Sequence, residues 1–164
     1  MIAAEAADDQ PAIRAINDAA FGRPDESDLI DRLRIEGAVV LSLVASFGGQ
    51  PVGHLLFSRM WIDTASGTVP AVALAPLAVM PAHQRSGIGS ALVRRGLDEL
   101  KRAGERVALV LGHAAYYPRF GFSSELARAL DHPFPPGALM ALELRPGALD
   151  EVRGRVRYAS SFGL

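Results

Sequence analysis

The segment that most constrains this chain is Gln84-Arg85-Ser86-Gly87-Ile88-Gly89-Ser90, which lies between an expected strand and a long expected helix. Its two glycines allow the backbone to approach an anion with no Cβ in the way. The first turn of the following helix presents amides with no acceptor inside the helix, and the helix dipole adds partial positive charge. The segment therefore predicts a pyrophosphate-binding loop, with Arg85 adding a charge at its rim.

Two other kinds of phosphate-binding loop fit this segment poorly. A nucleoside-triphosphate loop ends in Gly-Lys-Ser/Thr, and no lysine follows these glycines. A dinucleotide-binding fold needs three glycines early in a βαβ unit and an acidic residue at the end of the next strand. Here the next expected strand, Val107 to Leu111, is followed by Gly112 and His113. An unrelated nucleotide-binding protein is therefore the less favoured reading.

The rest of the chain alternates between helical and strand periodicity. Apolar residues at helical spacing predict helices over residues 8–20, 25–36 and 87–103, and a short helix over 114–120. Residues 2–5, 39–47, 52–61, 69–79, 107–111, 138–144 and 152–158 are expected strands. This order predicts an α+β or mixed α/β fold with one sheet flanked by helices. No repeat or linker interrupts the 164 residues, so we expect a single domain over 1–164.

Composition excludes several classes of function. The 17 basic and 18 acidic residues give a net charge of −1, so no overall field attracts nucleic acid or an anionic membrane. No apolar run approaches the roughly 20 residues of a membrane helix, and the N-terminus does not resemble a signal peptide. The chain has no cysteine, which excludes disulfides, thiolate metal sites and a cysteine nucleophile. We expect a cytoplasmic protein that binds no metal, nucleic acid or membrane.

Three motifs in one order resemble the Gcn5-related N-acetyltransferases, the GNAT family. Their signature Gln/Arg-x-x-Gly-x-Gly/Ala reads Gln84-x-x-Gly87-x-Gly89 here. Upstream, Leu74-Ala75-Pro76-Leu77-Ala78-Val79-Met80-Pro81 is similar to the strand that leaves its neighbour and hydrogen-bonds the pantetheine arm, which would account for a proline in a strand. Downstream, the segment from Leu111 to Phe122, with Tyr116-Tyr117 and Phe120-Gly121-Phe122, resembles the bacterial branch typified by the YhbS-like proteins.

The resemblance implies a fold, a co-substrate and a set of binding residues. The fold would be a single GNAT-like domain whose central, mostly antiparallel, twisted sheet is flanked by helices, with strands splayed at the cofactor site. The activity would be transfer of an acetyl group from acetyl-CoA to a primary amine, with no metal. The residues implied in binding acetyl-CoA are Leu77, Ala78, Val79, Gln84, Arg85, Ser86, Gly87, Ile88, Gly89 and Ser90.

The resemblance also implies catalytic residues. Tyr117 matches the family tyrosine that protonates the departing thiolate, and a phenol stays protonated at neutral pH. Many members place an acid on the strand before the loop, but Val69 to Val79 has none, so His113 and His54 are the candidate bases. Because the chain has no cysteine, we expect direct attack by the amine and no thioester enzyme intermediate.

Several alternatives stay open at this point. The missing strand acid also suits a non-catalytic acetyl-CoA-binding or regulatory module on the same fold. The acceptor can be a small molecule or a peptide amine, because the loops that would bind it carry no motif. Pairing of two copies through sheet edges is common in the family, so a homodimer is also open.

Overall fold

A computed structural model describes all residues, 1–164. The chain forms two compact units, one from Met1–Ser58 with Ala75–Asp98 and the other from Arg59–Leu74 with Glu99–Leu164. We call them the first and the second unit. One domain over 1–164 stays a prediction. The helices are α1 (Gln10–Phe21), α2 (Asp25–Glu36) and α3 (Ile88–Arg102), and the strands are β1 (Ile2–Ala4), β2 (Val39–Phe47), β3 (Gln50–Thr64), β4 (Gly67–Val79), β5 (Val107–Leu111), β6 (Leu130–Asp131), β7 (Leu139–Glu143) and β8 (Gly154–Tyr158).

The strands follow the order β1-β2-β3-β4-β5-β7, and β8 pairs with both β3 and β6. The pairs β1/β2, β2/β3, β3/β8 and β5/β7 are antiparallel, whereas β4/β5 and β6/β8 are parallel. The predicted mixed α/β fold with a mostly antiparallel sheet is therefore confirmed. Strand β6 was not expected, because two residues are too few to show periodicity.

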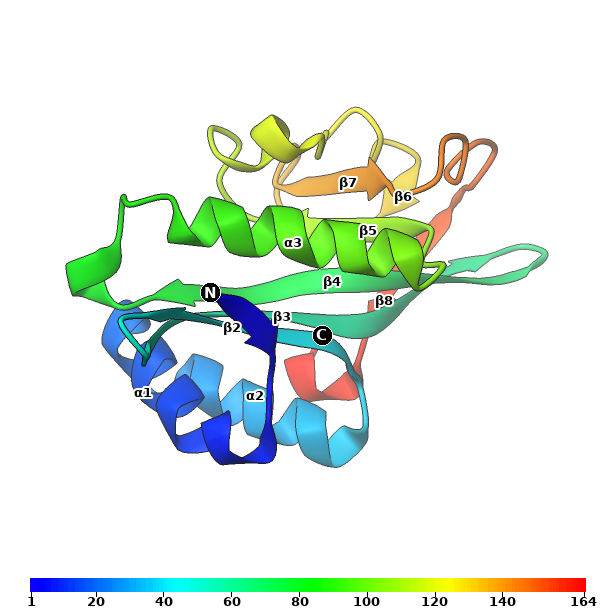
Figure 1. Cartoon of the computed structure of the whole chain (residues 1–164). Helices are drawn as coiled ribbons and strands as arrows, with labels where there is room; N and C mark the ends of the chain where they lie inside the picture. Colours follow the sequence, from blue (N-terminus) through cyan, green and yellow to red (C-terminus); the bar gives the residue numbers. More distant parts are fainter. The chain divides into compact units, whose positions relative to one another are not determined.

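The β2/β3 hairpin organises the first unit. Gly48 and Gly49 form its turn with φ of 58° and 79°, a left-handed pair that favours glycine at both positions. Neighbouring residues of β3 point to opposite faces: Gly53 lies against Ile88 of α3, and the side chain of His54 meets α1. Figure 1 shows the same division, with α1 and α2 on one side of β2 and β3 and α3 on the other.

Both N-terminal helices end at a glycine and bury an apolar stripe. Gly22 and Gly37 take left-handed φ angles of 69° and 76°, where β-carbons are disfavoured, so each helix stops there. The buried apolar residues between these helices and the sheet are Ile13, Ile16, Ile30 and Leu33 from the helices and Val44 and Leu56 from β2 and β3. Burying such side chains stabilises the unit by roughly 1.5–3 kcal/mol each, before entropy is counted.

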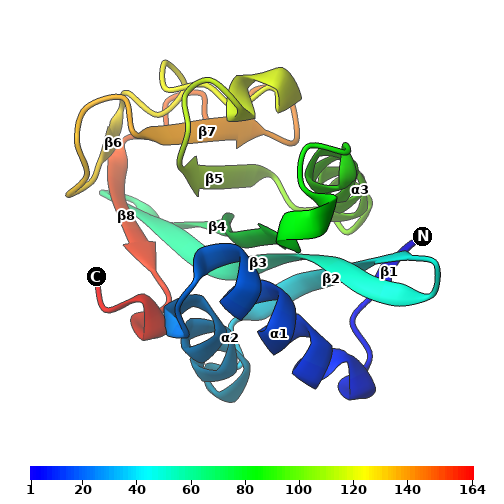
Figure 2. The same cartoon turned by 90° about the vertical axis from the view of Figure 1, so that its left-hand side faces the viewer.

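The core of the second unit lies among β5, β7 and β8 and the ends of β3 and β4. Figure 2 shows β5 beside β7 and β6 beside β8. Arg59 makes a two-point ion pair with Glu105, at 2.5 and 2.9 Å, and also donates to the Ala71 carbonyl. Strand β3 runs three residues further than the expected 52–61, and Asp63 in this extension pairs with Arg157 of β8.

No helix of the chain is both long enough and apolar enough to cross a membrane. The chain also has no group of three or more His, Cys, Asp or Glu side chains that could hold a metal ion.

Candidate functional site

Hydrogen bonds within the first unit fix the backbone path of the end of β4 and of the loop after it. The Met80 N–H donates to the Val52 carbonyl at 2.8 Å, which ties the end of β4 to β3. The Gln84 side-chain amide then reaches back to the Val79 carbonyl at 2.9 Å, and the Ser86 hydroxyl donates to the His83 carbonyl. The Gln84 side chain of the signature therefore closes the loop on itself; whether it also contacts acetyl-CoA stays a prediction.

The backbone of the loop is shaped for close approach of an anion. Arg85 and Gly87 take φ angles of 61° and 89°, and a Cβ on Gly87 would meet no atom within 4 Å, so the space over it is open. In the first backbone hydrogen bond of α3, the Ala91 N–H donates to the Gly87 carbonyl. The amides of Gly87, Ile88 and Gly89 donate to no atom of the chain. Three successive unpaired amides at a helix N-terminus can receive phosphate oxygens.

Two glycines bring α3 close to β3 and so place this helix start. A Cβ on Gly53 would lie 3.0 Å from Ile88 Cγ2 and 3.1 Å from Leu92 Cδ1. Further along α3, a Cβ on Gly96 would lie 2.7 Å from Phe57 Cε2. The helix therefore rests on β3 at both of these points. A glycine within a strand or a helix, where it otherwise weakens the element, is the sequence signal that could have identified these contacts.

The leading catalytic candidate, Tyr117, begins a 3₁₀ helix of the second unit, Tyr117–Phe120. Its ring is 8% exposed and packs edge-on against Phe122, with centroids 5.9 Å apart. It also covers Gly112, where a Cβ would lie 2.8 Å from Tyr117 Cε2. Burial raises the pKa of Tyr117 to about 12, and Tyr116 adds to the rise.

The Tyr117 hydroxyl keeps a route to solvent. It makes no hydrogen bond within the chain, yet it is not among the fully buried polar atoms without a partner. A buried ring with an accessible, unpaired hydroxyl leaves a proton donor available to a ligand. The pKa of about 12 keeps this hydroxyl protonated over the whole physiological range.

The two histidines proposed as bases lie in very different surroundings. His113 is exposed, and its carbonyl accepts the Tyr116 and Tyr117 amides at 3.0 and 3.3 Å, so its backbone fixes the turn that carries the tyrosines. His54 is completely buried on the α1 face of β3, and burial lowers its pKa to about 3, with Arg34 adding to the fall. Both of its ring nitrogens have partners, so the proposal of His54 as a base is wrong.

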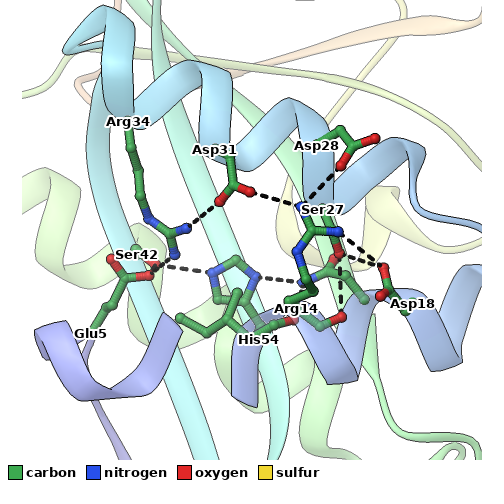
Figure 3. A network of polar contacts seen from close by, with 11 residues as sticks. Glu5, Arg14, Asp18, Ser27, Asp28, Asp31, Arg34, Ser42 and His54 are labelled. Atoms are coloured by element: carbon green, nitrogen blue, oxygen red, sulfur yellow. Dashed lines mark hydrogen bonds and ion pairs between the residues drawn. The ribbon is translucent and has the colours of Figure 1, made fainter. Parts of the chain in front are cut away.

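His54 belongs to a polar network that joins the helices to the sheet (Figure 3). Asn17 Nδ2 lies 2.9 Å from the Ile13 carbonyl and 3.2 Å from His54 Nδ1. A carbonyl only accepts, so this amide nitrogen donates and His54 Nδ1 must be unprotonated. The proton is therefore on Nε2, which lies 2.9 Å from Ser42 Oγ, and Ser42 in turn donates to Glu5 at 3.1 Å.

The same network carries the acids of α2. Arg34 donates to Glu5 at 2.5 Å and to Asp31 at 3.1 Å, and Arg14 of α1 bridges Asp31 and Asp28 at 2.7 and 2.9 Å. Figure 3 shows these side chains forming one chain of contacts between α1, α2 and the sheet. These acids therefore clamp two helices together and do not form a free anionic surface.

Comparison with known proteins decides the family. The Acetyltransferase (GNAT) family matches residues 8–122 of the chain. The chain belongs to the GNAT family of acetyltransferases. The N-acetyltransferase YjhQ of Escherichia coli K12 is 40% identical to it over 116 residues, which are 70% of this chain and 64% of that protein. The N-acetyltransferase YhbS of the same strain is 35% identical over 159 residues, 94% of this chain and 93% of that one.

Solved structures agree with this assignment. A crystal structure of YhbS from Escherichia coli in complex with CoA has a TM-score of 0.91 at 33% identity and covers all of this chain and 92% of that one. A GNAT acetyltransferase from Brucella melitensis in complex with acetyl-CoA has a TM-score of 0.83 at 34% identity, covering 99% and 97% of the two chains. The predicted family and its YhbS-like branch are therefore confirmed.

Proposed function

We propose that this GNAT protein transfers an acetyl group from acetyl-CoA to a primary amine by direct attack. The single observation that carries the proposal is the run of three unpaired amides, Gly87 to Gly89, at the start of α3. Phosphate oxygens of a CoA ester would complete their hydrogen bonding. The proposed binding set is that of the signature and the strand before it: Leu77, Ala78, Val79, Gln84, Arg85, Ser86, Gly87, Ile88, Gly89 and Ser90.

Tyr117 is the proposed general acid. The amine forms a bond to the thioester carbonyl carbon, the C–S bond breaks with its electrons on sulfur, and the hydroxyl of Tyr117 supplies a proton to that sulfur. A pKa of about 12 makes Tyr117 a weak acid toward a thiolate, whose thiol has a pKa near 8.5. We therefore expect a hydrogen bond that shortens as charge develops on sulfur, and a rate contribution of about 10- to 100-fold, at or below the low end of the range for general acids.

His113 is the proposed base for the proton that the amine loses. Histidine is the most common general base in enzymes, and an exposed side chain can reach an incoming amine. No carboxylate competes for the role on β4, whose sequence from Gly67 to Val79 contains no acid. If His113 is the base, His113→Gln lowers kcat/KM.

The experiment is release of free CoA from acetyl-CoA, followed with a thiol reagent over a panel of small amines, amino acids and peptides. The chain has no cysteine, so every thiol detected comes from CoA. We expect turnover with at least one class of amine, and kcat about 10- to 100-fold lower in Tyr117→Phe with Tyr116→Phe as matched control. Full turnover in Tyr117→Phe would remove the acid role; binding of acetyl-CoA with no turnover would instead identify a non-catalytic module.

A further inference from the structure

Phe47, the last residue of β2, is the most exposed aromatic side chain of the chain, with 66% of its surface accessible. Its ring does not stand alone, because the ring of His83 lies 5.4 Å away, tilted by 51°. His83 comes directly before the Gln84–Ser90 segment. An aromatic pair that is open to solvent therefore borders the phosphate-binding loop, within the first unit.

Hydrogen bonds hold the backbone segments that carry the two rings. Phe47 pairs with Gln50 across the two-glycine turn, and the Ser46 N–H donates to the Met1 carbonyl at 2.8 Å. On the other side, the His83 N–H donates to the Met80 carbonyl at 2.8 Å, and the His83 carbonyl accepts from the Ser86 hydroxyl. The pair is thus fixed to the loop that it borders, although little of the Phe47 side chain is buried.

The pair lies on the face of the hairpin that α3 covers. Ala45 lies two residues before Phe47. A Cβ built on Gly53 would lie 3.4 Å from the Ala45 Cβ and would also contact Ile88 and Leu92 of α3. The loop amides belong to the start of the same helix. A ligand whose pyrophosphate occupied these amides would carry its adenine a short distance from them, since one ribose joins the adenine to the pyrophosphate.

We propose that Phe47 and His83 form a stacking platform for the adenine ring of CoA. This inference rests on the proposed function, because it assumes that CoA occupies the loop. Stacking on an aromatic ring requires a π-face and tolerates any base, which matches an aromatic pair at the surface. The platform would bind the nucleotide end of the co-substrate and take no part in the chemistry at the thioester.

The test compares two ligands that share the pantetheine arm. Calorimetry would measure Kd for CoA and for 4′-phosphopantetheine, which lacks the adenosine 3′,5′-bisphosphate part of CoA. We expect Phe47→Ala to raise Kd for CoA by about 5- to 100-fold and to change Kd for 4′-phosphopantetheine by less than about twofold. His83→Ala should act in the same direction, Phe47→Trp should bind like the unchanged chain, and Phe47→Leu should not.

Ile35→Ala is the matched control, because Ile35 is an exposed apolar residue on α2. We expect it to leave both dissociation constants unchanged. An equal loss for both ligands in Phe47→Ala and His83→Ala, or no loss for either, would overturn the platform. Absence of binding of either ligand to the unchanged chain would overturn the proposed function itself, and the platform with it.

Discussion

Acidification should destabilise this protein through one buried residue, His54. Burial lowers its pKa from 6.5 to about 3. The groups that face it are Asn17 on α1, Ser42 on β2 and, beyond them, Glu5 and Arg34. Protonation would place a second N–H on Nδ1, opposite the Asn17 amide that already donates to it, and would bring a second cation near Arg34.

The sign of the effect follows from proton binding. Between pH 6.5 and 3 the unfolded chain binds a proton at His54 and the folded chain does not, so stability falls as the pH falls. At pH 5 the difference from 6.5 is about 1.5 pH units, and each unit is worth 1.36 kcal/mol, so the folded state loses about 2 kcal/mol. At pH 7.5 the histidine is neutral in both states and this loss is absent.

The choice of pH 5 separates His54 from the carboxyl groups. Arg23 lowers the pKa of Glu26, and Arg157 lowers the pKa of Asp63. Groups with lowered carboxyl pKa values stabilise the fold above their unfolded values, near 4, and lose that contribution only at lower pH. Between pH 7.5 and 5 these carboxyl groups therefore contribute little to the change.

Urea unfolding at pH 7.5 and 5.0 measures the effect. We expect the unchanged chain to lose about 2 kcal/mol more between these pH values than His54→Gln does, with equal m-values. His54→Gln should also be less stable at pH 7.5 by about 1–3 kcal/mol, because its partners lose hydrogen bonds. His113→Gln, at an exposed histidine, should keep the full pH dependence. Equal losses in the unchanged chain and His54→Gln would refute the reasoning.

Three further substitutions test contacts described above. Gly96→Ala should lower the free energy of unfolding by about 1–3 kcal/mol in urea denaturation, because its Cβ would lie 2.7 Å from Phe57 Cε2; full stability would contradict this contact. Gly112→Ala should displace the Tyr117 ring, so steady-state kinetics should show a lower kcat while calorimetry gives an unchanged Kd for acetyl-CoA. Arg59→Met should cost up to about 3 kcal/mol by thermal unfolding, since it leaves the mostly buried Glu105 unpaired, whereas Arg155→Met, in an exposed pair, should cost less than about 1 kcal/mol.

Local patterns predicted most of the elements. The helical periodicities over residues 8–20, 25–36 and 87–103 correspond to α1, α2 and α3 within two residues at each end. The predicted end of a strand was wrong where pairing with another strand decides its length. Strand β3 extends to Thr64 because β8 pairs with its last five residues, and Asp63 lies in that extension. The hydrogen bonds of a strand come from another segment, so its ends depend on a partner that local periodicity does not describe.

By itself, the sequence determined the GNAT family and the position of the two-glycine turn before α3, because both depend on residues that are neighbours along the chain. The free amides of a two-glycine turn before a helix follow from the local sequence and do not depend on where the turn lies in the fold. Only the tertiary structure decided the states of His54 and Tyr117. Their pKa values depend on desolvation, and the His54 partners Asn17 and Ser42 come from other elements of the fold. The same residue type, histidine, is thus completely buried and held neutral at position 54 and exposed at 113, because burial belongs to the packed chain and not to the residue.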